Sequence, residues 1–273
     1  MSTTIAFARL EFQIVYRNLW VAISVALMTL FAVVLTVAGS SPVGELGVDR
    51  LTVSVASLTT LSIYLVPLIA LLLAFDAIAG ELDRGLLALN LTYPVSRASY
   101  LTGKFIAHLL TLMIALGVGY GAAGILSALL GTVPSESWKS LALLYASAVV
   151  LGAAFLGLGY VVSCLVRQPA AAAGLVIGLW LVLVVLYDIA LLGSLVADSG
   201  GVFTSHVFPW LLVLNPADAF RLLNLAGGEA ALAASGISTA LHSLPVYMPL
   251  VSLLVWPAAA LLGAWCLFRR IEP

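Results

Sequence analysis

The chain has 273 residues, of which 63% are hydrophobic and only 8% are charged, and its formal net charge is -1 at pH 7. Soluble domains are roughly half apolar and one-quarter charged, so this composition excludes a soluble globular protein and indicates one that resides in a lipid bilayer. The near-zero charge excludes a nucleic-acid partner held by bulk charge, and the 2 cysteines cannot build a disulfide framework.

Hydrophobic runs of membrane-crossing length recur along the sequence. About 20 residues of helix cross roughly 30 Å of hydrocarbon, and several windows of that length carry no charge. We therefore predict an all-α polytopic membrane protein that forms a single transmembrane domain over residues 1–273. Its six predicted transmembrane helices cover, approximately, residues 20–38, 58–79, 104–130, 140–165, 169–196 and 246–268.

Local features add detail to these spans. The N-terminal segment, residues 1–20, has an amphipathic pattern typical of a helix at the membrane interface. Pro67 predicts a kink near the middle of the second span. Glycines in the third and fourth predicted spans allow close approach of neighbouring helices. They are Gly117, Gly121, Gly124, Gly152 and Gly159.

The stretch between the second and third predicted spans, residues 81–104, is too polar to remain in lipid. Leu82, Leu86 and Leu89 recur at helical spacing, which predicts a short amphipathic helix that Pro94 ends. Such a helix lies along a surface, with its leucines packed against a partner and its charges on the other face.

Glu81 and Arg84 lie one helical turn apart on the charged face and are close enough to pair. An exposed pair of this kind stabilises a helix by only a few tenths of a kcal/mol, so stability is a weak reason for the arrangement. Docking of another protein is a better one. The alternative is an ordinary loop whose charges only fix the orientation of the chain in the membrane.

The same stretch carries an ordered series of residues: Glu81, Gly85, Leu86, Leu87, Pro94, Val95, Ser96, Arg97 and Lys104. Taken together, and placed between two membrane helices, this series resembles the cytoplasmic coupling region of ABC type-2 permeases. The resemblance implies that the segment sits in a groove of a separate ATPase subunit and transmits its closure. It assigns ATPase coupling to Glu81, Arg84, Gly85, Pro94 and Arg97.

The resemblance extends over essentially the whole chain. It implies a homodimer surrounded by membrane lipid, bound to two cytoplasmic ABC ATPase subunits and to a periplasmic accessory protein, in a bacterial inner membrane. Within the family, the chain is most similar to permeases that serve the maturation of the copper centres of nitrous-oxide reductase. Whether the cargo is a sulfur species, a copper ion or only a mechanical signal stays open. An exporter of a lipid, drug or polysaccharide, and a scaffold without cargo, remain alternatives.

Residues that would support catalysis or cofactor binding do not form a recognisable set. The sequence has no Walker A loop, no HExxH and no GxSxG motif, and its methionines and cysteines are scattered. We therefore expect a subunit that is not an enzyme and holds no metal or cofactor, with ATP and magnesium bound by the partner ATPase.

Residues 197–245 contain short apolar pieces separated by glycines and prolines, none long enough to cross the membrane alone. We predict a folded cap on the periplasmic side, in which Asn215 caps a short helix that begins at Pro216. The charged residues of this cap would form an exposed rim that docks the periplasmic partner. They are Asp218, Arg221 and Glu229. The alternative is a lid that only stabilises the helices.

The orientation follows from the distribution of the 11 lysines and arginines. With six spans and a cytoplasmic N-terminus, the inner side holds eight: Arg9, Arg17, Arg84, Arg97, Lys104, Arg167, Arg269 and Arg270. The outer side holds three: Arg50, Lys139 and Arg221. The positive-inside rule therefore predicts that both termini are cytoplasmic.

Two aspartates lie within apolar windows, where an ionised side chain costs several kcal/mol unless it reaches water or a partner. Asp76 lies near the inner end of the second span and is a candidate for coupling, together with His108 one turn inside the third span. Asp188 lies near the outer end of the fifth span and is a weaker candidate. Alternatively, both aspartates only extend to the membrane surface.

Overall fold

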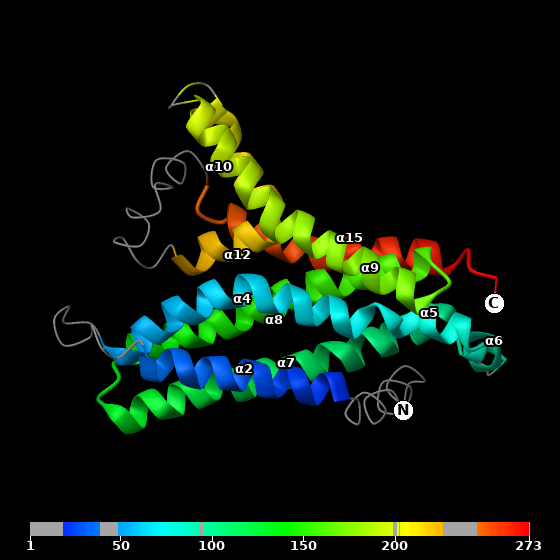
Figure 1. Ribbon diagram of the computed structural model, residues 1–273, viewed down its shortest axis with the longest axis horizontal. Helices are drawn as coiled ribbons and strands as arrows, with labels where there is room; N and C mark the ends of the chain where they lie inside the picture. The colour runs from blue at the N-terminus through cyan, green and yellow to red at the C-terminus, as the bar shows by residue number, and fades with distance from the viewer. Residues whose placement is uncertain are drawn as a thin grey trace.

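The computed structural model describes residues 19–38, 49–92, 95–198, 201, 203–225 and 245–272. Within these ranges the chain is helical throughout, with no strand (Figure 1). The helices are α2 (Leu19–Ala38), α4 (Arg50–Ala74), α5 (Asp76–Asp83), α6 (Leu86–Leu91), α7 (Arg97–Leu130), α8 (Ser135–Leu165), α9 (Pro169–Trp180), the π-helical η1 (Leu181–Leu186), α10 (Tyr187–Asp198), the π-helical η2 (Phe203–Val207), α11 (Phe208–Leu214), α12 (Pro216–Leu225) and α15 (Met248–Phe268).

Five continuous helical segments among the described residues are long and apolar enough to cross a membrane. They are Arg50–Asp83, Arg97–Leu130, Ser135–Leu165, Pro169–Asp198 and Met248–Phe268. A shorter apolar helix, Ala22–Ala38, lies at the position of the first predicted span. The prediction of an all-α polytopic membrane protein is confirmed. The predicted N-terminal interfacial helix, residues 1–20, lies almost wholly outside the described residues.

The spans begin earlier than their hydrophobic runs, because capping residues start each helix before the chain enters the apolar region. Asp49 accepts a hydrogen bond from the Thr52 amide, which starts α4 at Arg50 rather than near residue 58. Ser96 accepts one from the Ser99 amide, which starts α7 at Arg97 rather than at residue 104. The polar flanks that the sequence placed in loops are therefore first turns of membrane helices.

Helices α2, α4, α7 and α8 run side by side along the long axis of the molecule and contain most of its core (Figure 1). At one end lie α5, α6, the start of α7 and the last turn of α15; at the other lie the start of α4 and the turn between α7 and α8. Successive spans α4, α7 and α8 therefore run in opposite directions between the two ends, as the predicted order of spans requires. The described residues of the predicted coupling region therefore gather at one end of the bundle.

The fifth span, α9–η1–α10, diverges from this bundle, with α10 leading away from it (Figure 1). Only 17% of its most apolar window is buried inside the chain, against 61% for α8. Helix α15 packs along α8 but is also 17% buried over its window. These two helices present a broad apolar face to whatever surrounds the chain.

The predicted periplasmic cap contains a helical hairpin where it is described. Helices α11 and α12 meet at Asn215, whose side chain accepts a hydrogen bond from the Ala217 amide at 3.0 Å, so the predicted cap of α12 is confirmed. Helix α12 packs against α15, α8 and α4, where Phe220 is buried, whereas Leu222 is buried in a separate cluster with residues of α10 and α11. The hairpin therefore turns back onto the bundle instead of standing above it.

Glycines let α8 approach its neighbours closely. An added Cβ at Gly159 would lie 2.6 Å from the Cβ of Ala74, and one at Gly157 would lie 2.7 Å from the Cβ of Ala260. Gly124 and Gly152 are similarly crowded by side chains, as predicted. The prediction is wrong for Gly121, because no atom lies within 4 Å of its Cβ position. Its side of α7 faces away from the bundle.

These contacts predict opposite outcomes for two glycine substitutions. Gly159→Leu forces a side chain against the backbone and methyl of α4, so we expect a loss of about 1–3 kcal/mol and a lower melting temperature in detergent. Gly121→Leu, the matched control, meets open space and gains helix propensity of up to about 1 kcal/mol, so its melting temperature stays at or above that of the parent. Equal melting temperatures for the two variants contradict the packing of α8 on α4.

Candidate functional site

The predicted coupling helix is two helices joined by a left-handed turn. Helix α5 ends at Asp83, Gly85 has φ 67, and α6 begins at Leu86. Only glycine adopts this φ without strain, which accounts for its position in the turn. We call α5, the turn and α6 the coupling hairpin; it lies at one end of the bundle (Figure 1).

The turn at Gly85 changes which leucines are buried. The sequence predicted that Leu82, Leu86 and Leu89 share one face of a single helix, and the break at Gly85 instead places Leu82 in α5 and the other two in α6. Leu87 is buried at 1% exposure, whereas Leu86 and Leu89 are 41% and 57% exposed. A single continuous helix would keep positions 82, 86 and 89 together, but the break at Gly85 rotates α6 relative to α5. The hairpin therefore displays leucines at its surface.

Glu81 is not exposed, contrary to its predicted place on a charged outer face. Its Oε1 lies 2.8 Å from the Nζ of Lys104, and the side chains of Lys104 and Glu81 are only 4% and 10% exposed. The Tyr100 hydroxyl donates to Glu81 Oε2, and Asn90 Nδ2 donates to that hydroxyl at 3.1 Å. A buried, hydrogen-bonded ion pair thus fastens α5 to the start of α7.

Arg84 pairs with Asp76 instead of Glu81. Its Nη1 lies 3.6 Å from Asp76 Oδ2, and the two side chains are 53% and 42% exposed. The Asp76 carboxylate lies over Gly80, where a Cβ would collide with it, and its Oδ1 is buried without a hydrogen-bond partner among the described residues. The suggested association of Asp76 with His108 does not occur, because His108 is buried and its Nδ1 lies 2.7 Å from the Tyr160 hydroxyl.

The junction between α4 and α5 is held by a side chain from α8. The Ser163 hydroxyl donates to the Phe75 carbonyl at 2.7 Å and accepts from the amides of Ile78 and Ala79, both at 3.0 Å. One hydroxyl thereby partners three backbone groups at the point where the helix is interrupted. This fixes the direction in which α5 leaves the membrane span.

Arg97, to which the resemblance assigns ATPase coupling, is bonded to the end of α15. Its Nη1 donates to the carbonyls of Phe268, Arg269 and Ile271 at 3.1, 3.2 and 2.8 Å. Cationic side chains stabilise helix C-termini in this way, because the last carbonyls have no partner within the helix. Arg97 therefore ties the start of α7 to the end of α15. Pro94 lies outside the described residues.

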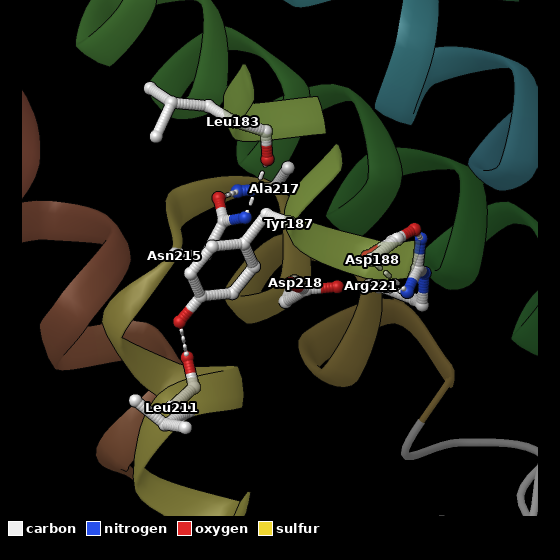
Figure 2. A network of polar contacts seen from close by, with 8 residues as sticks. All are labelled: Leu183, Tyr187, Asp188, Leu211, Asn215, Ala217, Asp218 and Arg221. Carbon is white, nitrogen blue, oxygen red and sulfur yellow. Dashed lines mark hydrogen bonds and ion pairs between the residues drawn. The ribbon is translucent and has the colours of Figure 1, made fainter. Parts of the chain in front are cut away.

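A second polar cluster lies where the fifth span meets the α11–α12 hairpin (Figure 2). Arg221 Nη2 lies 2.5 Å from Asp188 Oδ2, and its Nη1 donates to Asp218 Oδ1 at 2.8 Å. The Asp188–Arg221 pair supplies the partner that a lone acid in an apolar span requires. We call Asp188, Asp218 and Arg221 the outer cluster.

Two further bonds hold the same elements together. Asn215 Nδ2 donates to the carbonyl of Leu183 at 2.7 Å, and the Tyr187 hydroxyl donates to the carbonyl of Leu211 at 2.7 Å (Figure 2). Leu183 lies in η1, where the wider helix leaves carbonyls open to side chains. The α11–α12 hairpin is thus joined to the fifth span by hydrogen bonds to backbone carbonyls and by the Asp188–Arg221 ion pair.

The predicted exposed rim is wrong at Asp218, which is 1% exposed. Arg221 and Asp188 are also mostly covered, with side chains 21% and 20% exposed. The sequence placed Asp218 and Arg221 on the outer face of a surface helix, but α12 turns that face onto Asp188 of the fifth span. Glu229 lies outside the described residues.

Sequence reasoning missed the roles of Tyr100, Tyr160 and Ser163. A signal for the first was available, since Tyr100, Lys104 and His108 recur every four residues and so share one face of α7. No comparable pattern marks Ser163. In the part of the chain that the structure describes, no group of three His, Cys, Asp or Glu side chains is placed to hold a metal ion.

The comparisons with known proteins agree with this architecture of apolar spans and a polar hairpin. Residues 5–272 match the model of the ABC-2 family transporter proteins, so the chain belongs to this family and is a membrane-spanning permease of the ABC transporter class. Among its relatives is the probable ABC transporter permease protein NosY of Stutzerimonas stutzeri, 40% identical over 267 residues, 96% of each chain. The protein of the same name from Pseudomonas aeruginosa is 41% identical over 269 residues, again 96% of each.

The buried ion pair predicts a non-additive response to charge removal. Glu81→Gln removes the carboxylate that pairs with Lys104 in a buried site, and Lys104→Met removes the cation that pairs with Glu81, so each single variant loses about 3–5 kcal/mol of stability. The double variant removes both charges and regains most of this loss. Thermal unfolding of the purified chain in detergent measures all three.

The control is Lys139→Met, which breaks an ion pair of similar length, 2.7 Å, whose side chains are 71% and 77% exposed. Its effect stays below about 1 kcal/mol, because exposed pairs contribute little. A double variant as unstable as the sum of the two single variants shows that Glu81 and Lys104 do not depend on each other.

Proposed function

We propose that this chain is the membrane subunit of an ABC transporter whose ATPase subunits dock on the coupling hairpin. The observation that carries the proposal is the combination of exposed and buried groups in that hairpin. Leu86 and Leu89 face outward, while Glu81 behind them is bound to Lys104 of α7. A force applied at the leucines passes directly to a membrane-spanning helix.

The docking surface that this proposal uses differs from the one expected from sequence. Its contact residues are Arg84, Leu86 and Leu89, which are exposed around the Gly85 turn. Glu81 serves the same coupling from inside, as a connection to α7 instead of a contact. The ATPase supplies ATP binding, magnesium and hydrolysis.

We place the coupling hairpin on the cytoplasmic side of a bacterial inner membrane. Among the described residues, the end of the bundle that carries the hairpin also carries most of the cations: Arg84, Arg97, Lys104, Arg167, Arg269 and Arg270. The positive-inside rule supports a cytoplasmic location for this end and for both termini. The α11–α12 hairpin then belongs to the periplasmic side.

The proposed assembly is a homodimer with two ATPase subunits and a NosD-like periplasmic accessory protein. The apolar face of the fifth span supports the dimer, because it buries only 17% of its most apolar window within one chain. Ile177, Ile189 and Leu192 are 50%, 59% and 61% exposed on this span. Lipid covers whatever part of this face a second copy leaves open.

We further propose that the assembly acts in maturation of the copper centres of nitrous-oxide reductase, by transport or by mechanical signalling to the periplasmic partner. The support is the similarity to NosY proteins over 96% of both chains. The mostly apolar spans favour signalling over passage of a charged cargo, since an unpaired charge within lipid costs several kcal/mol.

Charge on the exposed leucines tests the docking proposal. We expect Leu86→Asp combined with Leu89→Asp to reduce co-purification of the ATPase subunit at least tenfold, because two desolvated carboxylates replace apolar contacts. The matched control is Leu130→Asp, 48% exposed at the opposite end of the bundle, which leaves co-purification unchanged. Undiminished co-purification with the double variant places the ATPase elsewhere.

The copper proposal is tested separately in a denitrifying bacterium. Deletion of the gene for this chain is expected to leave nitrous-oxide reductase with less copper per protein, and the parent gene restores it. The Leu86→Asp, Leu89→Asp variant does not restore the copper content, because the ATPase subunit no longer binds. A full copper content in the deletion strain removes this chain from the maturation process while leaving the docking result intact.

A further inference from the structure

The outer cluster contains one more negative charge than its contacts neutralise. Both Nη atoms of Arg221 donate hydrogen bonds to Asp188, at 2.5 and 3.3 Å. Only Nη1 donates to Asp218, at 2.8 Å. Two ionised carboxylates and one guanidinium carry a net charge of -1 in a site between apolar helices. Such a charge is costly away from water, and binding one proton removes it.

The two carboxyl groups are not equivalent. Asp188 is 20% exposed, and both of its carboxylate oxygens accept hydrogen bonds from Arg221. Asp218 is 1% exposed, and its Oδ2 is buried without a hydrogen-bond partner among the described residues. An ionised carboxylate oxygen needs donors, so the unpartnered oxygen marks Asp218 as the group that takes up the proton.

The groups around the cluster do not offset the excess charge. Helix α12 packs against α4, α8, α11 and α15, and from these helices Tyr64 of α4 is the ionisable group that acts on Arg221. Tyr187 of α10 faces Asp218, but its hydroxyl donates to the Leu211 carbonyl. In the parts of these elements that the structure describes, no second cation is bonded to the cluster.

We propose that Asp218 is a proton-binding site and that its neutral carboxylic acid, beside the Asp188–Arg221 ion pair, fastens the α11–α12 hairpin to the fifth span (Figure 2). The ligand is one proton, which occupies a carboxyl oxygen of Asp218 and is released to water when the cluster is exposed. Opening of the contact between α10 and α12 is thereby coupled to proton release.

The raised pKa of Asp218 agrees with this geometry. Burial raises the pKa of Asp218 to about 8; the Arg221 charge opposes the rise, and the neighbouring Asp188 charge adds to it. Because the folded chain binds the proton more tightly than the unfolded chain, this group's contribution to stability is complete below about pH 4. It falls as the pH rises toward about 8 and is constant above that.

Infrared spectroscopy of the full chain in lipid vesicles detects the proton directly. At pH 6 the parent is expected to show the carbonyl stretch of a protonated carboxylic acid, which disappears with a midpoint near pH 8. The band shifts on labelling with ¹³C-aspartate, is absent in Asp218→Asn, and is retained in Glu136→Gln, an exposed acid used as control. The absence of the band from the parent at pH 6, or its persistence in Asp218→Asn, overturns the proposal.

Thermal unfolding provides the second measurement. Asp218→Asn mimics the neutral carboxyl and does not titrate, so its melting temperature rises relative to that of the parent between pH 4 and about pH 8 and then stays a constant amount above it. A difference that does not change with pH overturns the proposal. If Asp218→Asn does not fold, the parent spectrum decides alone: a band that fails to shift with ¹³C-aspartate is not Asp218.

Discussion

Lipid offers no hydrogen bonds, and this constraint governs every place where the chain departs from a regular helix. At Phe75, where α4 passes into α5, the Ser163 hydroxyl partners the backbone groups of both helices. At the end of α15, the Arg97 side chain donates hydrogen bonds to the last carbonyls and so caps the helix. At these two points a polar side chain from a neighbouring helix bonds to the backbone, so both are also points at which helices are joined.

The same constraint operates on the periplasmic side of the proposed assembly. Asn215 donates to a carbonyl of the π-helical segment, and Ser252 and Trp256 of α15 donate to the carbonyls of Val213 and Leu214 at the end of α11. The α11–α12 hairpin is therefore fixed to the fifth span through the Asn215 side chain and to α15 through the last carbonyls of α11. A surface loop in water would need none of these bonds.

The two charged clusters stand at opposite ends of this framework and differ in balance. The Glu81–Lys104 pair is neutral and closed, with a tyrosine hydroxyl on the remaining carboxylate oxygen, which suits a permanent connection between the coupling hairpin and α7. The outer cluster has two carboxylates for one guanidinium and leaves an oxygen without a donor. A rigid joint at the coupling hairpin and an adjustable one at the other end suit the proposed transmission of movement across the membrane.

The sequence by itself determined the number and order of apolar segments, the position of the polar hairpin, and local caps such as Asn215 before Pro216. These features depend on residues close together in the chain, through hydrophobicity, periodicity and capping. It did not determine that Glu81 is buried against Lys104, that Arg84 pairs with Asp76, or that Asp218 is covered. A periodic pattern identifies which residues share a face, but the partner of that face depends on how distant helices pack. At Gly85 a single left-handed residue redirected the following helix, and at Asp218 the return of α12 onto the fifth span converted an exposed face into a buried one.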